Sequence, residues 1–488
     1  MNYDNIQPLL GDFLRRGMVI SPWLMMHSQA RFDVNLFSDI DRLARDMVAV
    51  KWTDAEKIEV FGEFPLSERV PRTAAYEIIA STALSIAHDK FGDLEIYPEQ
   101  IVEATNLLKD FSADYGFGNI VKIYGFVTSF ENAQALHYYG QIPEKIFNLG
   151  SWHRPWVDYS LNDEILWGVF QGNYQLKIED HQRYVTLTER GEAFYFATMN
   201  ILEGCGYLTQ RVRQLQIHNF SFYSNYAEVA NEFWPNMMQL RRDFLEWSGV
   251  QPGMIVLELG CANGVATFDA GLAKQVGETG LVIGIDPSMG MIFRANKRKD
   301  ELKANWVTFH QAKAEQLPFD NASFDAVIAF NSLHFMDLPL ALMEIKRVLK
   351  PNGLFASMHP TKFNIAQISW VTEWFAPIIE QAKYRTDENP KDNQKSPNEI
   401  YSEFRQADLL NISECIIEVD NFFRDSEMAT NHTLRGVGWM QEELSMIPWK
   451  AREDIFNKVL EQGRLLCEKY SPEQRMIKSP MQMIKGNR

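Results

Sequence analysis

A turn of small residues, Gly260, Ala262 and Gly264, follows the acidic residue Glu258 at the end of an apolar run. A second apolar run ends at another acid, Asp286, about 20 residues further on. Small residues let the polar groups of a ligand lie against bare backbone, and a carboxylate at the second position can hold ribose hydroxyls. The spacing predicts a site for a nucleoside-type ligand. The alternative is an ordinary strand–helix turn that binds nothing.

These residues belong to a pattern of alternating strands and helices in the second half of the chain. The apolar runs predicted as strands are 254–257, 281–285, 306–310, 323–330 and 354–357. Helical patterns, including 265–275 and 338–349, separate them. This alternation predicts an α/β fold, a parallel sheet with helices on both faces. Ligands bind such sheets at the carboxyl ends of the strands, which is where Asn331 is expected.

Four blocks of the second half resemble class I S-adenosylmethionine-dependent methyltransferases, especially the ubiquinone/menaquinone-biosynthesis-like group. The blocks are Val256–Gly264, Gly284–Asp286, Ala314–Phe319 with Phe324–Val327, and Glu344–Gly353. They arrive in the order and spacing of that family. The resemblance implies a Rossmann-like methyltransferase sheet, S-adenosylmethionine as the cofactor, and a methyltransferase activity.

The resemblance also implies roles at the cofactor site. The turn that ends at Gly264 would face the methionine and ribose portions, with Glu258 accepting a hydrogen bond from the ammonium group. Asp286 would bind both ribose hydroxyls. The remaining cofactor-binding residues are Ala314 and Glu315 at the adenine edge, Asn331 at the end of its strand, and Tyr223 in the segment that closes over the cofactor. Tyr223 has core packing as an equal alternative.

Two positions depart from the family pattern. Ala262 stands where glycine is usual, and its methyl group is tolerated if the backbone angles there are ordinary. Lys313 stands where the family usually has an aspartate that contacts the adenine amino group. A lysine cannot accept that hydrogen bond. Both positions therefore predict weaker cofactor binding or a different adenine pose.

A base is needed when the methyl acceptor is a hydroxyl group, and two histidines are candidates. His334 follows the fourth strand in the segment Leu333–Asp337. Plant-type small-molecule O-methyltransferases carry their base histidine in a similar setting, which favours O-methylation over N- or C-methylation. His359 near the end of the fifth strand is the second candidate. A structural role is the alternative for His334.

The first half is expected to contain a helical region, 1–120, and a winged-helix-like domain, 121–217. Helices at 130–139, 142–149 and 162–171 precede two strand-like runs at 174–178 and 183–187, and Thr188 is expected to cap the next helix. Acids outnumber bases in this half, which disfavours DNA binding. Homodimerisation, or a wall of the substrate pocket, is favoured instead.

The methyltransferase domain is expected over 218–488, with a lid or insertion around 361–410 and 424–470 and a mobile loop at 385–398. The net charge of −16 disfavours nucleic acid and anionic membranes. Four widely separated cysteines favour a reducing cytoplasm without structural metal. The expected acceptor is a small or medium organic molecule. The alternatives are a macromolecular acceptor and a regulator that binds S-adenosylmethionine without transferring its methyl group.

Overall fold

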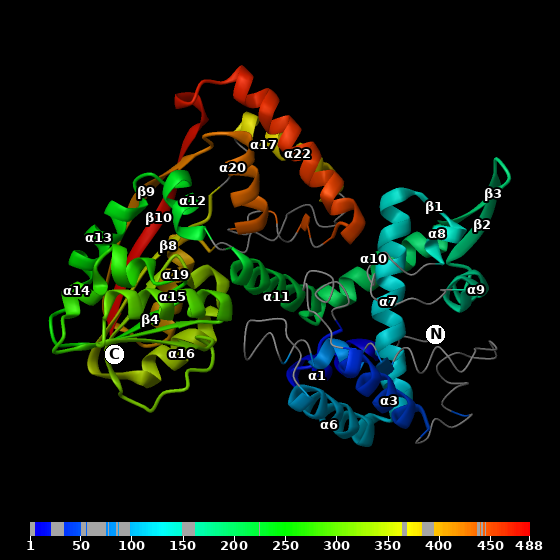
Figure 1. Ribbon diagram of the computed structural model, residues 1–488, viewed down its shortest axis with the longest axis horizontal. Coiled ribbons are helices and arrows are strands. Elements are labelled where there is room, and N and C mark those ends of the chain that lie inside the picture. The colour runs from blue at the N-terminus through cyan, green and yellow to red at the C-terminus, as the bar shows by residue number, and fades with distance from the viewer. Residues whose placement is uncertain are drawn as a thin grey trace.

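The computed structural model contains a sheet-based half and a helical half, and helix α11 (Tyr207–Phe222) lies between them (Figure 1). The residues that the structure describes are 5–20, 34–49, 55, 75–76, 78–83, 86, 98–148, 162–223, 225–363, 368–382, 395–436, 440, 443–444 and 446–488. Among them, no helix combines the length and the apolar character needed to cross a membrane.

The sheet of the second half has seven strands in the order β6-β5-β4-β7-β8-β10-β9. Neighbours from β6 to β8 are parallel, and β10 is antiparallel to both β8 and β9. The strands are β4 (Ile255–Leu259), β5 (Leu281–Asp286), β6 (Val307–Gln311), β7 (Phe324–Phe330), β8 (Leu349–Pro360), β9 (Leu410–Phe422) and β10 (Met476–Asn487). The predicted α/β fold class is therefore confirmed, and the last two strands in the order, β10 and β9, add an antiparallel edge to the parallel sheet.

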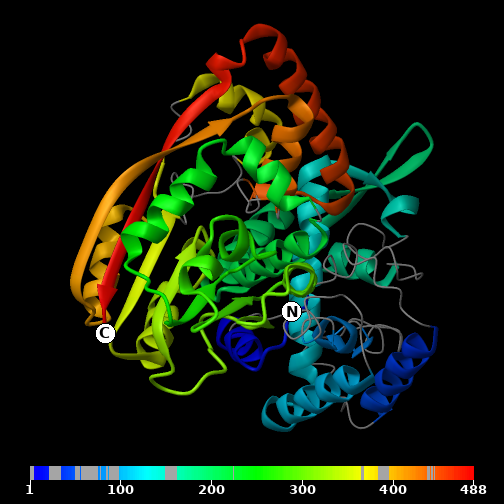
Figure 2. The same cartoon turned by 60° about the vertical axis from the view of Figure 1, so that its left-hand side comes forward.

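Helices cover both faces of this sheet (Figure 2). Helix α13 packs against one face, and α16 and α19 pack against the other. Both faces are covered because the buried strands carry apolar side chains on both sides of the sheet. The helices of this half are α12 (Tyr226–Phe233), α13 (Met237–Ser248), α14 (Leu272–Val276), α15 (Met289–Leu302), α16 (Leu338–Val348), α17 (Ser369–Trp374), α18 (Ala376–Ala382), α19 (Pro397–Gln406), α20 (Ser426–Asn431) and α22 (Trp449–Lys469).

The helix expected over 265–275 is divided in two. A π-helical turn, η1 (Val265–Asp269), ends before Gly271, whose φ of 99° lies in the left-handed region. Glycine adopts this angle without steric cost, so it ends one helical segment and starts α14. Within the expected lid, α17 and α18 pack against α22, whereas residues 364–367 and 383–394 lie outside the described part of the chain. Most of the expected mobile loop falls there, and its last residues, 395–398, lead into the start of α19.

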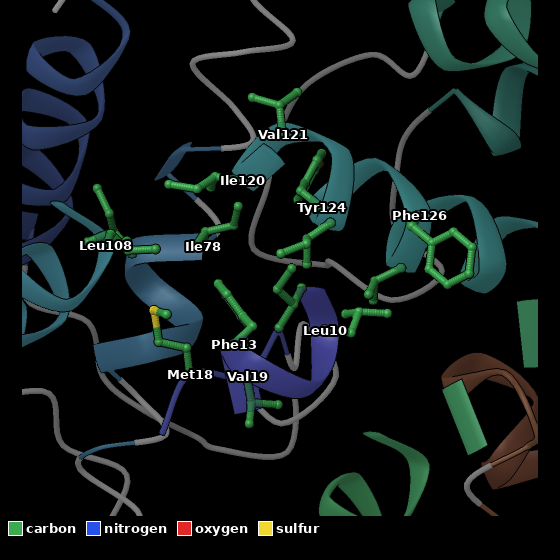
Figure 3. Close-up of a cluster of buried hydrophobic side chains, with 14 of the residues drawn as sticks. Leu10, Phe13, Met18, Val19, Ile78, Leu108, Ile120, Val121, Tyr124 and Phe126 are labelled. Carbon is green, nitrogen blue, oxygen red and sulfur yellow. The ribbon is translucent and has the colours of Figure 1, made fainter. Parts of the chain in front are cut away.

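Among the described residues of the first half, the larger apolar core contains side chains from Ile6 to Leu208, and Figure 3 shows part of it. A smaller, separate cluster that includes Ile142, Phe147 and Val185 lies at the three-stranded sheet. Its helices are α1 (Ile6–Arg15), α3 (Val34–Ala49), α6 (Pro98–Tyr115), α7 (Phe117–Tyr139), α8 (Glu144–Phe147), α9 (Asn162–Phe170), α10 (Glu189–Gly204) and α11 (Tyr207–Phe222). The boundaries expected at 120 and 218 fall inside α7 and α11. The division into these domains stays a prediction.

A three-stranded antiparallel sheet, order β1-β3-β2, follows α7. Its strands are β1 (Gln141–Pro143), β2 (Tyr174–Glu179) and β3 (Gln182–Leu187). The helix expected at 130–139 is the end of the 23-residue α7, which stops at Gly140 with a φ of 72°. The helix expected at 142–149 is wrong for its first residues, because Ile142 belongs to β1 and pairs with Val185 of β3. Thr188 caps α10 as predicted, by accepting a hydrogen bond from the Gly191 backbone N–H.

Candidate functional site

A cavity of about 350 Å³ lies between the carboxyl ends of the central strands and helix α11. This is the edge at which parallel sheets bind ligands. Seven of the residues expected to bind the cofactor line the cavity: Glu258, Gly260, Ala262, Asp286, Ala314, Glu315 and Asn331. They come from the ends of three strands and from the segment after β6. The tertiary structure therefore brings together most of the predicted cofactor site.

The turn after β4 is shaped by left-handed backbone. Gly260 has a φ of 66°, and a side chain on it would meet the Cβ atom of Ser332 at 2.4 Å. Ala262 has a φ of 47°, so the ordinary backbone angles that would make its methyl group tolerable are not present. An L-residue in this region costs about 1 kcal/mol or more relative to glycine. The alanine is accommodated at the expense of some strain.

Asp286 is buried at the end of β5, and both of its carboxylate oxygens face backbone donors. They accept hydrogen bonds from the backbone N–H groups of Ala262 at 3.0 Å and Ser288 at 2.8 Å. Burial raises the pKa of Asp286 to about 6, although these hydrogen bonds act in the opposite direction. Each oxygen retains a lone pair, so the carboxylate can still accept from two hydroxyl groups of a ligand.

Glu258 and Arg241 place opposite charges on one wall of the cavity. Glu258 is 1% exposed and accepts a hydrogen bond from the Thr267 hydroxyl, and burial raises its pKa to about 7. Arg241 is 4% exposed, and burial lowers its pKa while Tyr226 and Glu258 counteract that effect. Among the described residues, the Arg241 Nε atom has no hydrogen-bond partner. A ligand with an ammonium and a carboxylate group satisfies both charges.

Sequence reasoning missed Arg241, although a signal was present. The buried positions of α13 are Met237, Arg241, Phe244, Leu245 and Ser248. An arginine within an otherwise apolar helical face is unusual, because a buried charge needs a partner. That pattern could have marked the residue as a ligand contact.

Segment 313–315 forms the other side of the cavity. Glu315 Oε1 accepts a hydrogen bond from the Asp337 backbone N–H at 2.7 Å, so this carboxylate holds the loop before α16. Lys313 lines the cavity at the position where the family pattern has an acid. The departure noted in the sequence is thus located at the cavity wall.

Two predicted cofactor residues lie outside the cavity lining. Gly264 has a φ of 79° and packs beside Phe268, where it precedes η1. The Tyr223 hydroxyl is 3.2 Å from Nδ1 of His432, a buried histidine in the insertion after β9. Burial raises the pKa of Tyr223 and lowers that of His432 to about 3. Only folding brings these two residues together.

The two candidate bases also lie outside the lining. His334 is half-buried in a short 3-10 turn after β7, its Nδ1 atom has no partner among the described residues, and burial lowers its pKa to about 3. His359 is buried in β8, with Nδ1 at 3.0 Å from the Ser357 hydroxyl and Nε2 at 3.1 Å from Gln482 Oε1. Burial lowers its pKa to about 4. A base role for His359 would require one of these hydrogen bonds to break.

In the described part of the chain, no cluster of His, Cys, Asp and Glu has the arrangement of a metal site. The expected metal-free site therefore stays a prediction. Cys261 lies in the turn, but burial raises its pKa, so it is a packing residue rather than a reactive thiolate.

Residues 251–422 match the family described as a methyltransferase domain. Demethylmenaquinone methyltransferase from Staphylococcus aureus is 32% identical over 183 residues, which cover 35% of this chain and 74% of that protein. The chain belongs to the S-adenosylmethionine-dependent methyltransferases. The cofactor of this family is S-adenosylmethionine, and the cavity fits it: Glu258 and Arg241 suit its amino-acid end, and Asp286 suits its ribose.

Two further relatives match shorter stretches. The 2-phytyl-1,4-naphtoquinone methyltransferase of Trichormus variabilis is 31% identical over 137 residues, 28% of this chain and 59% of that protein. The ubiquinone/menaquinone biosynthesis C-methyltransferase of a Shewanella species is 38% identical over 126 residues, 25% of this chain and 47% of that protein. The matches therefore span about half the length of these two relatives. Among solved structures, YcgJ from Bacillus subtilis is 18% identical, with a TM-score of 0.34 over 51% of this chain and 98% of its own.

Proposed function

We propose that this protein transfers a methyl group from S-adenosylmethionine to a carbon atom of a small quinone-type aromatic acceptor. The observation that carries the cofactor half of this proposal is the cavity in which Glu258, Arg241 and Asp286 converge. The names of the relatives support the acceptor half. These names do not support the O-methylation that the sequence favoured. We therefore propose that the nucleophile of the acceptor is a carbon atom rather than an oxygen atom.

The cofactor, when bound, supplies an electrophilic methyl group on a sulfonium. The residues of the chain contribute binding and orientation, because alignment is the main requirement of such a transfer. Arg241 and Glu258 hold the carboxylate and ammonium ends, and Asp286 holds the ribose. The small residues at 260 and 262 leave room for the ligand at the carboxyl edge of the sheet.

A proton must leave the acceptor during transfer, and His334 remains the candidate to receive it. It lies outside the lining but between two lining residues, Ser332 and Phe335, so its side chain has to turn toward the cavity to take this role. Its lowered pKa keeps the ring neutral at physiological pH, so a ring nitrogen is available as an acceptor. The same low pKa makes the imidazole a weak base. The contribution expected of His334 is therefore orientation of the acceptor and transient proton transfer.

The test is incubation of the full chain with S-adenosylmethionine and a panel of reduced naphthoquinones and benzoquinones. Release of S-adenosylhomocysteine and the mass of the product report on transfer, and NMR of the product distinguishes a C-methyl from an O-methyl group. Asp286→Ala is the inactive control. Binding of S-adenosylhomocysteine without any methylated product across the panel would contradict the proposal and favour a regulator. An O-methyl product would contradict the carbon preference alone.

A further inference from the structure

Helix α11 supplies a wall of the cavity from outside the matched methyltransferase domain, which begins at residue 251. Its cavity-lining residues are Gln210, Arg213, Gln216, Ile217 and Phe220. Their spacing of three or four residues places them on one face of the helix. The first half of the chain therefore contributes directly to the pocket next to the cofactor cradle. Figure 1 shows α11 between the sheet-based half and the other helices of the first half.

Both ends of α11 are anchored. Near its start, the Arg211 Nη1 atom lies 3.8 Å from the Glu131 Oε1 atom of α7, and the two side chains are 1% and 0% exposed. At its end, the Arg294 guanidinium of α15 donates to the carbonyl oxygens of Phe220 at 2.9 Å and Ser221 at 3.0 Å. A helix held at both ends presents its cavity face in a fixed position. Such a face can select a ligand.

The cavity face of α11 changes from apolar to polar along its length. Phe220 packs against Phe335, with ring centroids 5.7 Å apart, and Ile217 lies one turn before it. Arg213, Gln210 and Gln216 then present guanidinium and amide groups. At about 1.5 Å per residue, Arg213 lies roughly 10 Å along the helix from Phe220. This gradient suits a ligand with an aromatic body and a polar end.

Among the residues that the structure describes around the cavity, none forms an ion pair with Arg213. Glu315 is engaged with the Asp337 backbone, and Asp337 caps α16 by accepting from the Leu340 N–H at 3.3 Å. Glu258 and Asp286 belong to the cofactor cradle. Arg213 is half-buried and has no hydrogen bond or ion pair with any described residue. Lys313 adds a second positive charge to the cavity lining.

We propose that the Arg213 end of the cavity binds a carboxylate carried by the methyl acceptor. A guanidinium recognises a carboxylate with two parallel hydrogen bonds, and the side-chain amides of Gln210 and Gln216 can donate further ones. The aromatic body of the acceptor lies toward Phe220 and Phe335. This inference rests on the proposed methyl transfer and narrows the acceptor class to acidic aromatic molecules.

The test compares two probes, 1,4-dihydroxynaphthalene bearing a 2-carboxylate and the same ring bearing a 2-carboxamide. Binding of each to the full chain saturated with S-adenosylhomocysteine is measured by calorimetry under anaerobic conditions. We expect the wild type to bind the carboxylate about tenfold more tightly, which corresponds to about 1.4 kcal/mol, since a half-buried guanidinium can form a charge-assisted, bidentate pair with it. Arg213→Gln should remove this preference, and Arg213→Lys should restore part of it.

The matched control is Arg464→Gln, an exposed arginine of α22, which should leave both affinities unchanged. Affinity for S-adenosylhomocysteine should be the same in all variants. The inference is overturned if the wild type shows no preference for the carboxylate, including binding of neither probe. It is also overturned if Arg213→Gln weakens the binding of both probes equally, or weakens the binding of S-adenosylhomocysteine instead. If the wild type does not bind S-adenosylhomocysteine, that result contradicts the proposed function rather than the carboxylate site.

Discussion

The Asp286 carboxylate joins the ends of two neighbouring strands, because it accepts a hydrogen bond from the backbone N–H of Ala262 at 3.0 Å. Strands β4 and β5 are paired, with Leu259 opposite Ile285, so the turn after β4 lies beside the end of β5. The same carboxylate is then available to a ligand in the cavity. One residue therefore both shapes the cradle and supplies its charge.

Replacement of this carboxylate, Asp286→Ala, should weaken binding of S-adenosylhomocysteine about 100-fold or more. Two hydrogen bonds to a charged acceptor are lost, each contributing about 1.5–3 kcal/mol. Titration calorimetry measures the change. Asp408→Ala, at an acid whose side chain is 83% exposed, is the control and should bind normally. An Asp286→Ala protein that folds and binds with unchanged affinity would remove Asp286 from the site.

The pKa of Glu258 predicts a pH dependence for the ligand-free protein and for cofactor binding. The pKa of Glu258 is about 7 in the folded protein, above the usual 4.5. Between pH 4.5 and 7, Glu258 is therefore protonated in the folded protein but ionised in the unfolded chain. The contribution of Glu258 to the free energy of unfolding therefore falls as the pH rises from 4.5 to 7.

Cofactor affinity should change in the opposite direction, because the ammonium group favours ionised Glu258. As the pH is raised toward 7, the affinity for S-adenosylhomocysteine should increase by up to about tenfold per pH unit. Calorimetry in two buffers of different ionisation enthalpy should detect proton release at pH 6.5. In Glu258→Gln the release should be smaller, with the remainder coming from Asp286. An unchanged release in that variant would show that another group titrates.

Strain at Ala262 predicts a stabilising substitution. Ala262→Gly should raise the free energy of unfolding by about 0.5–1 kcal/mol, since relief of the left-handed alanine exceeds the entropy that glycine adds to the unfolded chain. Thermal denaturation of the ligand-free protein measures the change. Ala266→Gly, within the neighbouring π-helical turn, is the comparison and should destabilise. Destabilisation by both substitutions would contradict the assigned strain.

The role of His334 is separable from that of His359. His334→Ala should lower turnover at least about tenfold and leave the affinity for S-adenosylhomocysteine unchanged, because a positioned acid–base group contributes to rate rather than to cofactor binding. His359→Ala should instead lower the melting temperature, since it leaves the buried Ser357 and Gln482 groups unpaired. Unchanged turnover in His334→Ala would assign that histidine to structure.

The sequence by itself determined the α/β fold of the second half and the family. Apolar runs and glycine turns act over a few residues, so strand ends such as Glu258 and Asp286 can be read from local patterns. The same reasoning failed at Ile142, where pairing with Val185 in a distant strand overrides the helical pattern. It also gave no angle for Ala262, because a left-handed φ depends on the packing of the surrounding turn.

Only the tertiary structure decided what faces the cofactor cradle. Arg241 lies on a helix that the sequence presents as a packing stripe, and its proximity to Glu258 arises from the packing of α13 on the sheet. His432 reaches Tyr223 across 209 positions of the chain. Arg213 reaches the cavity because α11 is anchored to α7 and α15. Contacts of this kind depend on how separate elements pack, and no local spacing in the sequence records that packing.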